Sequence, residues 1–339
     1  MNADAKKKTI FITGATGFLG GALLKQFSAE KFDVRVLIRN PKAFHSEFHN
    51  VSVIEGDITK SETLKGQLAD IDTVIHAAGV VTDWASKSLY RDVHVGGTKN
   101  LIEEAVKSGV KKIVFISSLS VLDYSAPGMH SEHSPLTKIK NGYAGTKKEA
   151  EEMILSYHKR GLIEAVIIRP GWIYGKNDTT FIPEIVYQTK RNKMVIVGNS
   201  RNRVPFVHVD NLAELIRIAC EKEIKDANIF NIADGNISWK DLTEKISKSV
   251  QSNRPIPSIP YLIAISLAHI LESFARFSGS KKRPLLTVSS VQMIGRDMAS
   301  ESITAREVLR YFPRISFEEG LNSVIMQIAK RRLNELKMK

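Results

Sequence analysis

Residues 9–21, TIFITGATGFLGG, decide the fold. Three β-favouring residues run into Gly14, Gly17 and Gly20, and small and apolar residues then open a helix. A buried strand that turns sharply into a helix directs free backbone N–H groups, and the positive end of the helix dipole, at one point. Glycine is needed there because a β-carbon would block the tight turn and the approach of a pyrophosphate. The stretch predicts a dinucleotide site, although its G-x-x-G-x-x-G spacing would also fit ordinary loop glycines if no further motif followed.

The composition is that of an ordinary globular protein. With 339 residues, 43% of them hydrophobic and 25% charged, the chain suits one large α/β unit or two domains that share a cleft. The single cysteine, Cys220, excludes an intramolecular disulfide and predicts a cytoplasmic protein. A formal net charge of +13 could attract nucleic acid, anionic lipid or a phosphorylated cofactor. No helix-turn-helix, zinc-ligand or ribonucleoprotein pattern accompanies this charge, so neither nucleic-acid binding nor a metal site is predicted.

Short apolar runs alternate with helical patterns from residue 9 onward, which is typical of β-α-β units and a parallel sheet. After the first strand, the runs predict six more, at 34–38, 51–54, 73–76, 112–116, 165–168 and 228–231, with a helix at 211–221 before the last. Two regions, 171–203 and everything after Gly235, show no regular strand pattern. Insertions of this kind build substrate pockets beyond the carboxyl ends of the strands.

The predicted fold class is therefore α/β, with a doubly wound Rossmann sheet of about seven parallel strands and a smaller, mostly helical lid domain. The dinucleotide-binding domain is discontinuous in this prediction, covering residues 8–170 and 204–234. The substrate-binding or lid domain covers residues 171–203 and 235–330.

Arg39 lies just past the second strand, at the place where the adenosine ribose of a dinucleotide would lie. A carboxylate near this place would hold the ribose hydroxyls, whereas an arginine suits a 2′-phosphate. Because Ile38 occupies the carboxylate's position, the sequence favours NADP(H) and leaves NAD(H) as the other option. A solvated charge at a strand end is the alternative for Arg39.

Two more strand ends carry candidate cofactor contacts. Asp57 closes the third strand and could accept a hydrogen bond from the adenine amino group, or cap a helix beginning near Lys60. After the fourth strand, the run Ala77, Ala78 and Gly79 offers a small-residue floor for a nicotinamide ribose, although a simple turn would have the same composition.

Tyr143 and Lys147, in the run YAGTK, carry the predicted chemistry. At positions i and i+4 they share a helix face, so the phenol and the ammonium can converge. A nearby cation stabilises the tyrosinate and is expected to lower the phenol pKa, so that tyrosine can exchange a proton with a carbonyl or alcohol oxygen. A Tyr-x-x-x-Lys pair alone is usually a surface pair, but this one follows Ser117 and Ser118 at the end of the fifth strand.

With these residues in place, the chain resembles the extended short-chain dehydrogenase/reductase family of the NAD-dependent epimerase/dehydratase superfamily. The matching motifs follow the family's order over roughly 200 residues: TGATGFLG (13–20), GDI (56–58), HAAG (76–79), SSLSV (117–121), YAGTK (143–147), RPGWIYG (169–175) and FVHVDNLA (206–213). The resemblance implies that Ser118 holds the substrate oxygen, that Tyr143 is the acid/base, and that Lys147 binds the nicotinamide ribose while tuning Tyr143. The predicted cofactor contacts are Gly14, Thr16, Gly17, Phe18, Leu19, Gly20, Arg39, Asp57, Ile58, Ala77, Ala78, Gly79, Tyr143, Lys147, Pro170, Gly171 and Ile173.

One motif departs from the family pattern. The family usually shows Asn-Val-x-Gly-Thr on the fourth helix, where the asparagine supports a proton-relay water near the lysine. This chain has His94 at the asparagine position. We interpret His94 as structural. It is also the one feature that favours an alternative function, a non-catalytic dinucleotide-binding redox sensor.

The branch of the family is indicated by two regions. Dehydratases carry an acidic pair directly after the catalytic serine or threonine, and Leu119 and Ser120 stand there instead, so dehydration is not predicted. The segments GRDMASES (295–302) and FPRISFEEGL (312–321) resemble the 3β-hydroxysteroid dehydrogenase-like branch. That branch implies hydride transfer to or from a sterol-like or long-chain 3-oxoacyl substrate. A nucleotide-sugar epimerase or reductase is the alternative, and more polar groups would be expected in its lid.

The lid also carries an apolar segment, residues 259–277, followed by the basic run 281–283. Its length and its charged and polar members argue against a transmembrane helix. Three interpretations stay open: a buried lid helix, a wall of a hydrophobic substrate pocket, or an interfacial helix anchored by basic residues. We predict a pocket wall with peripheral membrane contact through 259–283. A homodimer is a further expectation, since many relatives dimerise through the helices after the fourth and fifth strands.

Overall fold

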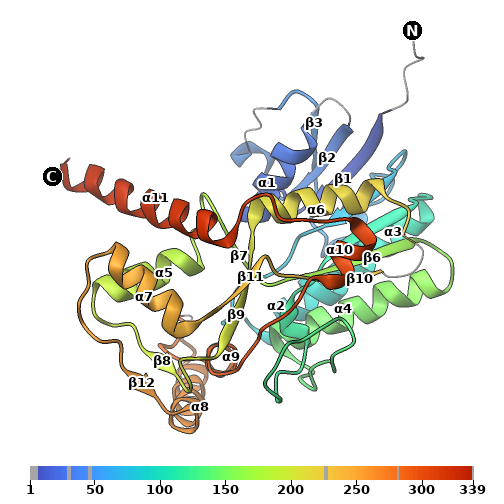
Figure 1. The fold of residues 1–339 in the computed structure, drawn as a ribbon. Helices are drawn as coiled ribbons and strands as arrows, with labels where there is room; N and C mark the ends of the chain where they lie inside the picture. The colour runs from blue at the N-terminus through green and yellow to red at the C-terminus, as the bar shows by residue number, and fades with distance from the viewer. Residues whose placement is uncertain (1–6, 29–31, 45–47, 225–227, 281, 338–339) are drawn as a thin grey trace.

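The structure is a computed structural model that describes residues 7–28, 32–44, 48–224, 228–280 and 282–337 (Figure 1). Its centre is a seven-stranded parallel sheet of order β10-β6-β5-β4-β1-β2-β3. The strands are β1 (Lys8–Thr13), β2 (Phe32–Ile38), β3 (Val51–Glu55), β4 (Thr73–His76), β5 (Lys112–Ile116), β6 (Glu164–Pro170) and β10 (Ile229–Ile232). The strand order reverses between β1 and β4, so the predicted doubly wound sheet is confirmed.

Helices cover both faces of this sheet (Figure 1), which is why its central strands β1, β4, β5 and β6 are mostly apolar and buried. On β1, Ile10 and Ile12 pack with α1 (Phe18–Phe27) and α6 (Val209–Glu221). Between them, Phe11 packs with α3 (Gly97–Lys107) and α4 (Gly142–Lys159) on the other face. The short helical turns of this unit are η1 (Pro41–Ala43), η2 (Ser61–Thr63), α2 (Lys87–Tyr90), the π-helical η3 (Arg91–Gly96) and η4 (Leu119–Val121).

The regions without strand patterns do contain short strands, so that expectation is wrong. A three-stranded sheet has the order β11-β9-β7, and a two-stranded one pairs β12 with β8. Their strands are β7 (Trp172–Tyr174), β8 (Ile196–Val197), β9 (Arg203–His208), β11 (Gly235–Ser238) and β12 (Ser258–Ile259). Strands of two to four residues are too short to show a period of two in the sequence.

The smaller part of the molecule has its own aromatic core, which includes Tyr174, Phe206 and Trp239. Around it lie α5 (Phe181–Lys190), α7 (Trp239–Ser249), α8 (Tyr261–Phe277), α9 (Val288–Ile294) and α11 (Phe317–Lys337). The chain returns to the large sheet at α10 (Ile303–Leu309), whose Ala305 and Leu309 join the core against α6 and β10. Within the described residues, no helix combines the length and apolarity that crossing a membrane would require.

Candidate active site

The glycine turn lies directly on the loop that follows β4. Gly14 has a φ of +80°, and a β-carbon built on it would lie 2.7 Å from the Ala77 carbonyl carbon and the Ala78 nitrogen. A β-carbon on Gly20 would overlap the Gly14 carbonyl oxygen. Gly17 then starts α1 without a side-chain cap and with no acidic residue in the first turn. The helix therefore leaves uncapped N–H groups beside a concave backbone turn, and this arrangement fits a dinucleotide phosphate.

The predicted cofactor contacts in the glycine turn differ in how far their side chains are buried. Thr16 is exposed and Phe18 is half-buried, whereas Leu19 is buried in the core between the sheet and α6. Leu19 can therefore contribute to a cofactor site only through its backbone, at the uncapped start of α1.

Arg39 is exposed just beyond the carboxyl end of β2 and forms no hydrogen bond or ion pair with the described residues. Asp57 instead receives two hydrogen bonds on one carboxylate oxygen, from the backbone and side chain of Thr59, each 2.9 Å long. The capping interpretation of Asp57 is wrong, because η2 begins at Ser61 without a side-chain cap. Ile58 is buried against Gly97 of α3, so it faces the core.

A chain of hydrogen bonds fixes the floor beneath the loop after β4. Thr98 donates to the backbone carbonyl of His94 (2.5 Å), so it must accept from Nε2–H of the buried His76 (3.0 Å). Nδ1 of His76 then accepts from the Thr13 hydroxyl (2.8 Å), which itself accepts the Ala78 N–H (3.2 Å). These bonds join the carboxyl ends of β1 and β4 to helix α3, and they fix the position of the run Ala77, Ala78 and Gly79.

His94 is neutral and bonded at both ring nitrogens. Its Nε2 accepts the Val80 N–H (2.9 Å), so the proton lies on Nδ1, which donates to the Thr146 hydroxyl (2.9 Å). Burial, together with the neighbouring Lys147, lowers the pKa of His94 to about 3. The ring therefore joins the loop after β4 to the start of α4, in agreement with a structural role.

The buried histidines predict a specific loss of stability in acid. Burial lowers the pKa of His76 to about 3 as well, while both histidines titrate near 6.5 once unfolded. The contribution of the two neutral histidines to the free energy of unfolding is fully present above pH 6.5. It is lost as the pH falls toward 3, because only the unfolded chain takes up these protons in that window. Between about pH 7.5 and pH 5, we expect a loss of about 2 kcal/mol per histidine in urea unfolding. His94→Asn should remove about half of this dependence, and an unchanged dependence would show that folded His94 is protonated.

Ser118, Tyr143 and Lys147 meet at the carboxyl end of β5. Lys147 is buried, donates from Nζ to the Ile116 carbonyl (2.8 Å) and lies over the Phe115 ring at 4.8 Å. The Ser118 side chain interacts with the Tyr143 phenol and acts to lower its pKa, and the Tyr143 ring packs edge-on against His94 at 5.5 Å. A hydroxyl pair with an ammonium one helical turn away is an arrangement that can hold a carbonyl oxygen and exchange a proton with it.

The protonation of this group differs from the sequence expectation. Burial raises the pKa of the Tyr143 phenol, and the interaction with Ser118 lowers it only in part. The expectation of a lowered phenol pKa is therefore wrong for the protein alone, because desolvation outweighs the stabilisation of the tyrosinate. Burial also lowers the pKa of the Lys147 ammonium to about 8, although Glu151 acts in the opposite direction.

Sequence reasoning missed the ion pair behind Lys147. Glu151 lies one further turn along α4 and forms three hydrogen bonds of 2.6–3.2 Å with Arg169 at the end of β6. Both side chains are almost fully buried, at 1% and 2% exposed. The i+4 spacing of Tyr143, Lys147 and Glu151 on one helix face was the available signal. The pair ties the helix that carries Tyr143 to the strand that leads into Pro170.

The predicted contacts after β6 lie where the two sheets meet. Pro170 ends β6, and Gly171 donates its N–H to the Ile232 carbonyl (2.8 Å). A β-carbon on Gly171 would lie 2.5 Å from the Pro205 carbonyl oxygen, so the close approach of two backbones requires glycine there. Ile173, in β7, is half-buried against the core of the large sheet.

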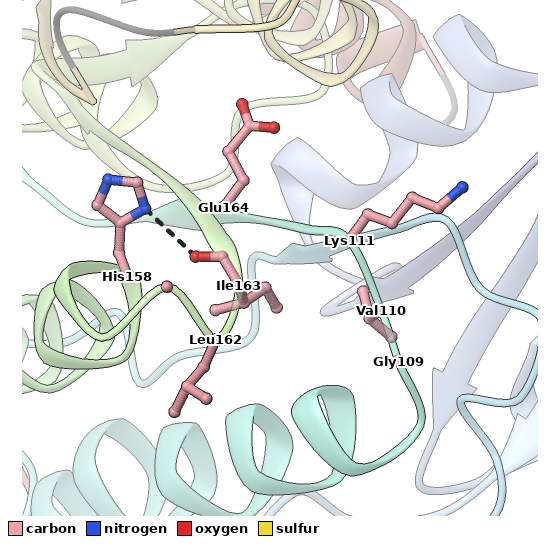
Figure 2. A pocket seen from close by; sticks show the side chains of 8 residues that line it. Gly109, Val110, Lys111, His158, Leu162, Ile163 and Glu164 are labelled. Atoms are coloured by element: carbon pink, nitrogen blue, oxygen red, sulfur yellow. Dashed lines mark hydrogen bonds between the residues drawn. The ribbon is translucent and has the colours of Figure 1, made fainter.

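A separate pocket, shown in Figure 2, lies at the opposite end of the sheet. Its lining consists of Gly109, Val110, Lys111, His158, Gly161, Leu162, Ile163 and Glu164. These residues precede or begin β5 and β6, whereas Ser118 and Tyr143 lie beyond the carboxyl ends. In parallel α/β sheets ligands bind at the carboxyl ends, so we assign no function to this pocket.

Residues 10–233 match the model of the NAD-dependent epimerase/dehydratase family. The chain belongs to this family. Its members in the comparisons include several reductases and dehydrogenases, and the chain is an oxidoreductase acting on CH–OH or C=O groups. The solved structure of gox2253 has the same fold, with a TM-score of 0.78, 24% identity, and coverage of 96% of this chain and 99% of that one.

Three curated relatives of this epimerase/dehydratase family align over most of the chain. A 4-hydroxy-2-methyl-3-oxo-4-farnesyl-3,4-dihydroquinoline-1-oxide ketoreductase of Stigmatella aurantiaca is 27% identical (93% of this chain, 95% of the relative). An N-acetyl-alpha-D-glucosaminyl-diphospho-ditrans,octacis-undecaprenol 4-epimerase of Escherichia coli O157:H7 is 28% identical (84% of each). A decarboxylating sterol-4-alpha-carboxylate 3-dehydrogenase of Candida albicans is 25% identical (93% and 96%). The chain is an extended short-chain dehydrogenase/reductase of the 3β-hydroxysteroid dehydrogenase-like branch.

Proposed function

We propose that this oxidoreductase transfers a hydride between NADP(H) and a ketone or secondary alcohol of a hydrophobic substrate, with Ser118, Tyr143 and Lys147 as its catalytic residues. The observation that carries the proposal is the meeting of the Ser118 and Tyr143 hydroxyls beside a buried ammonium at the carboxyl end of β5. The non-catalytic sensor is not favoured, because His94, its only support, bonds the β4 loop to α4.

The residues divide the chemistry among them, and a bound nicotinamide would supply or accept the hydride. Ser118 donates a hydrogen bond to the substrate oxygen and places it next to the phenol of Tyr143. Tyr143 gives its proton to that oxygen in reduction, and takes it back in oxidation. Lys147 stabilises the negative charge on the phenol oxygen as its proton leaves. The ion pair of Glu151 and Arg169 keeps α4, and with it the phenol, at a fixed distance from β6.

The preference for NADP(H) is supported by the free guanidinium of Arg39. A bidentate guanidinium matches a 2′-phosphate, and β2 ends in the buried Ile38 where a carboxylate would hold ribose hydroxyls. We expect Arg39→Ala to weaken NADPH binding by about tenfold to a hundredfold, since a charge-assisted contact contributes about 1.5–3 kcal/mol. NADH binding should change less than twofold in fluorescence titrations. Equal losses for both cofactors would contradict the preference, and Lys42→Ala is a nearby control.

A hydrophobic substrate is supported by two exposed apolar side chains, Val81 and Leu285, near the loop after β4. Asp83, in the loop after β4, accepts hydrogen bonds from Arg283 (2.6 Å, twice) and Thr287 (2.6 Å), so the segment before α9 is held against that loop. Val81 lies two residues before Asp83 and is 79% exposed, and Leu285 lies two residues after Arg283 and is 83% exposed. Apolar side chains exposed where these two segments meet favour an apolar ligand.

A second candidate is epimerisation of a lipid-linked sugar, which is favoured by the similarity to the undecaprenol-linked 4-epimerase. It would use the same three residues, but the hydride would return to the substrate, so no reduced cofactor would be consumed. The proposal is tested by following NADPH absorbance with a long-chain 3-oxoacyl compound, a 3-oxosteroid and a keto-sugar nucleotide. Consumption with either apolar ketone supports the proposal. Consumption with the keto-sugar alone would favour a nucleotide-sugar reductase instead.

A further inference from the structure

Helix α8 exposes six of its large apolar side chains to solvent, while its alanines, together with Tyr261 and Ile265, face the protein. Ala264, Ala268 and Ala275 face inward and are at most 9% exposed. The outer stripe comprises Leu262, Ile263, Leu267, Ile270, Phe274 and Phe277, which are 40–94% exposed. A surface helix normally has the opposite distribution, with its large apolar residues toward the core. An apolar patch of this extent marks an interaction site.

The inner face of α8 already packs against the rest of the protein, so the outer stripe is not the face that holds α8 to the fold. Ala264 and Ala268 pack against Val291 of α9 and Val197 of β8. The carboxylate of Glu272 accepts the Val288 N–H (2.7 Å), which ties the helix to the start of α9. The stripe therefore faces away from the fold, and α8 lies at the outer end of the smaller domain (Figure 1).

The charges around α8 are those that an anionic partner requires. Glu272 is the only acidic residue between positions 255 and 290, and its carboxylate is mostly buried and bonded to the protein. Arg276 lies between the last two members of the stripe, and Lys282 and Arg283 follow it along the chain, although Arg283 is paired with Asp83. Exposed Leu285 comes two residues after Arg283. A symmetric contact between two α8 helices would bring the same cations from both copies, and residues 255–290 hold no acidic residue besides the bonded Glu272.

We propose that the outer stripe of α8 docks on an anionic lipid bilayer, with the basic residues that follow it at the level of the headgroups. An interfacial helix of this kind sinks its apolar face into the boundary between headgroups and acyl chains, and nearby cations add attraction to anionic lipid. The convex helix fits a planar bilayer because it presents a ridge rather than a groove. Docking there would bring the exposed side chains of Val81 and Leu285 toward the lipid from which a hydrophobic substrate comes.

The test is sedimentation of the full-length chain with vesicles of phosphatidylcholine alone, or of phosphatidylcholine and phosphatidylglycerol in equal parts. The wild-type chain should bind the anionic vesicles, and binding should weaken as salt is added. The double variant Phe274→Ser with Phe277→Ser should bind at least about tenfold more weakly, because two exposed rings no longer enter the interface. Lys282→Gln should weaken binding by about fivefold.

Matched controls distinguish binding through α8 from nonspecific binding through exposed apolar or basic residues elsewhere. Phe312→Ser removes a ring that is 67% exposed outside α8, and Lys65→Gln removes an exposed lysine far along the chain; both should bind as wild type. The proposal is overturned if the wild-type chain leaves anionic vesicles unbound, or if the controls lose as much binding as the α8 variants. It is also overturned if the double variant only dissociates a dimer in sedimentation velocity, since a second copy would then cover the stripe. Because binding is measured without turnover, a failure here leaves the proposed reaction untouched.

Discussion

Replacing Tyr143 by phenylalanine is expected to lower kcat by at least about a thousandfold, since the variant loses the group that exchanges a proton with the substrate oxygen. The phenylalanine ring keeps the edge-on contact with His94, so the start of α4 should keep its position. Cofactor affinity should change less than twofold, because Lys147 and the glycine turn are untouched. The measurement is steady-state turnover together with fluorescence titration of NADPH.

Tyr157→Phe is the matched control for this experiment. Tyr157 lies on the same helix as Tyr143, but it packs against the core between the large sheet and helices α3 and α4, remote from Ser118. Its hydroxyl has no part in the proposed reaction, so kcat should stay within about twofold of wild type. If Tyr143→Phe retained wild-type turnover, the assignment of Tyr143 as acid/base would be wrong. Loss of turnover together with loss of NADPH binding would point to a damaged fold instead.

Replacing Glu151 by leucine is expected to cost about 3–5 kcal/mol of unfolding free energy. The change leaves the Arg169 guanidinium buried, charged and without its three hydrogen bonds. Removal of one partner of a buried pair is costly because the other charge has lost its water as well. The double variant Glu151→Leu with Arg169→Met should recover most of this loss. Urea unfolding followed by tryptophan fluorescence measures both.

The same helix offers a control pair of identical chemistry. Glu149 also forms a bidentate pair with an arginine, Arg91, with two hydrogen bonds of 3.0 Å, but both side chains are more than a third exposed. Water screens this pair, so Glu149→Leu should cost no more than about 1 kcal/mol. A loss at Glu149 as large as that at Glu151 would contradict the argument from burial.

The sequence was sufficient for the large sheet because its central strands are buried on both faces and carry apolar runs. The bounds of β4 and β5 agree with the predicted 73–76 and 112–116. The short strands β7, β8, β11 and β12 were missed, since a few residues show no period, and the six-residue strand β9 was missed as well. The orientation of α8 could not be predicted either, because nearly every face of the segment is apolar and only the packing against α9 decides which face is inside.

At the site, spacing predicted the residues that share an element and missed those that meet across elements. Tyr143 and Lys147 follow from their i+4 spacing, whereas Ser118 was implied by the resemblance to the family. The partnership of Glu151 with Arg169 depends on how α4 lies against β6. That of Asp83 with Arg283, 200 residues apart, depends on how the smaller domain closes on the β4 loop. Burial reversed the expected shift of the Tyr143 pKa, because residue spacing gives no information about desolvation.

The central claim is net hydride transfer from a reduced nicotinamide to a ketone carbon, and isotope transfer tests it most directly. The protein would be incubated with NADPH that carries deuterium at both C4 positions of the nicotinamide and with a long-chain 3-oxoacyl compound, and the product would be analysed by mass spectrometry. The account predicts one deuterium on the carbinol carbon for each NADPH consumed, and none with Tyr143→Phe. An alcohol product without deuterium, or a substrate epimer formed with no consumption of NADPH, would contradict it.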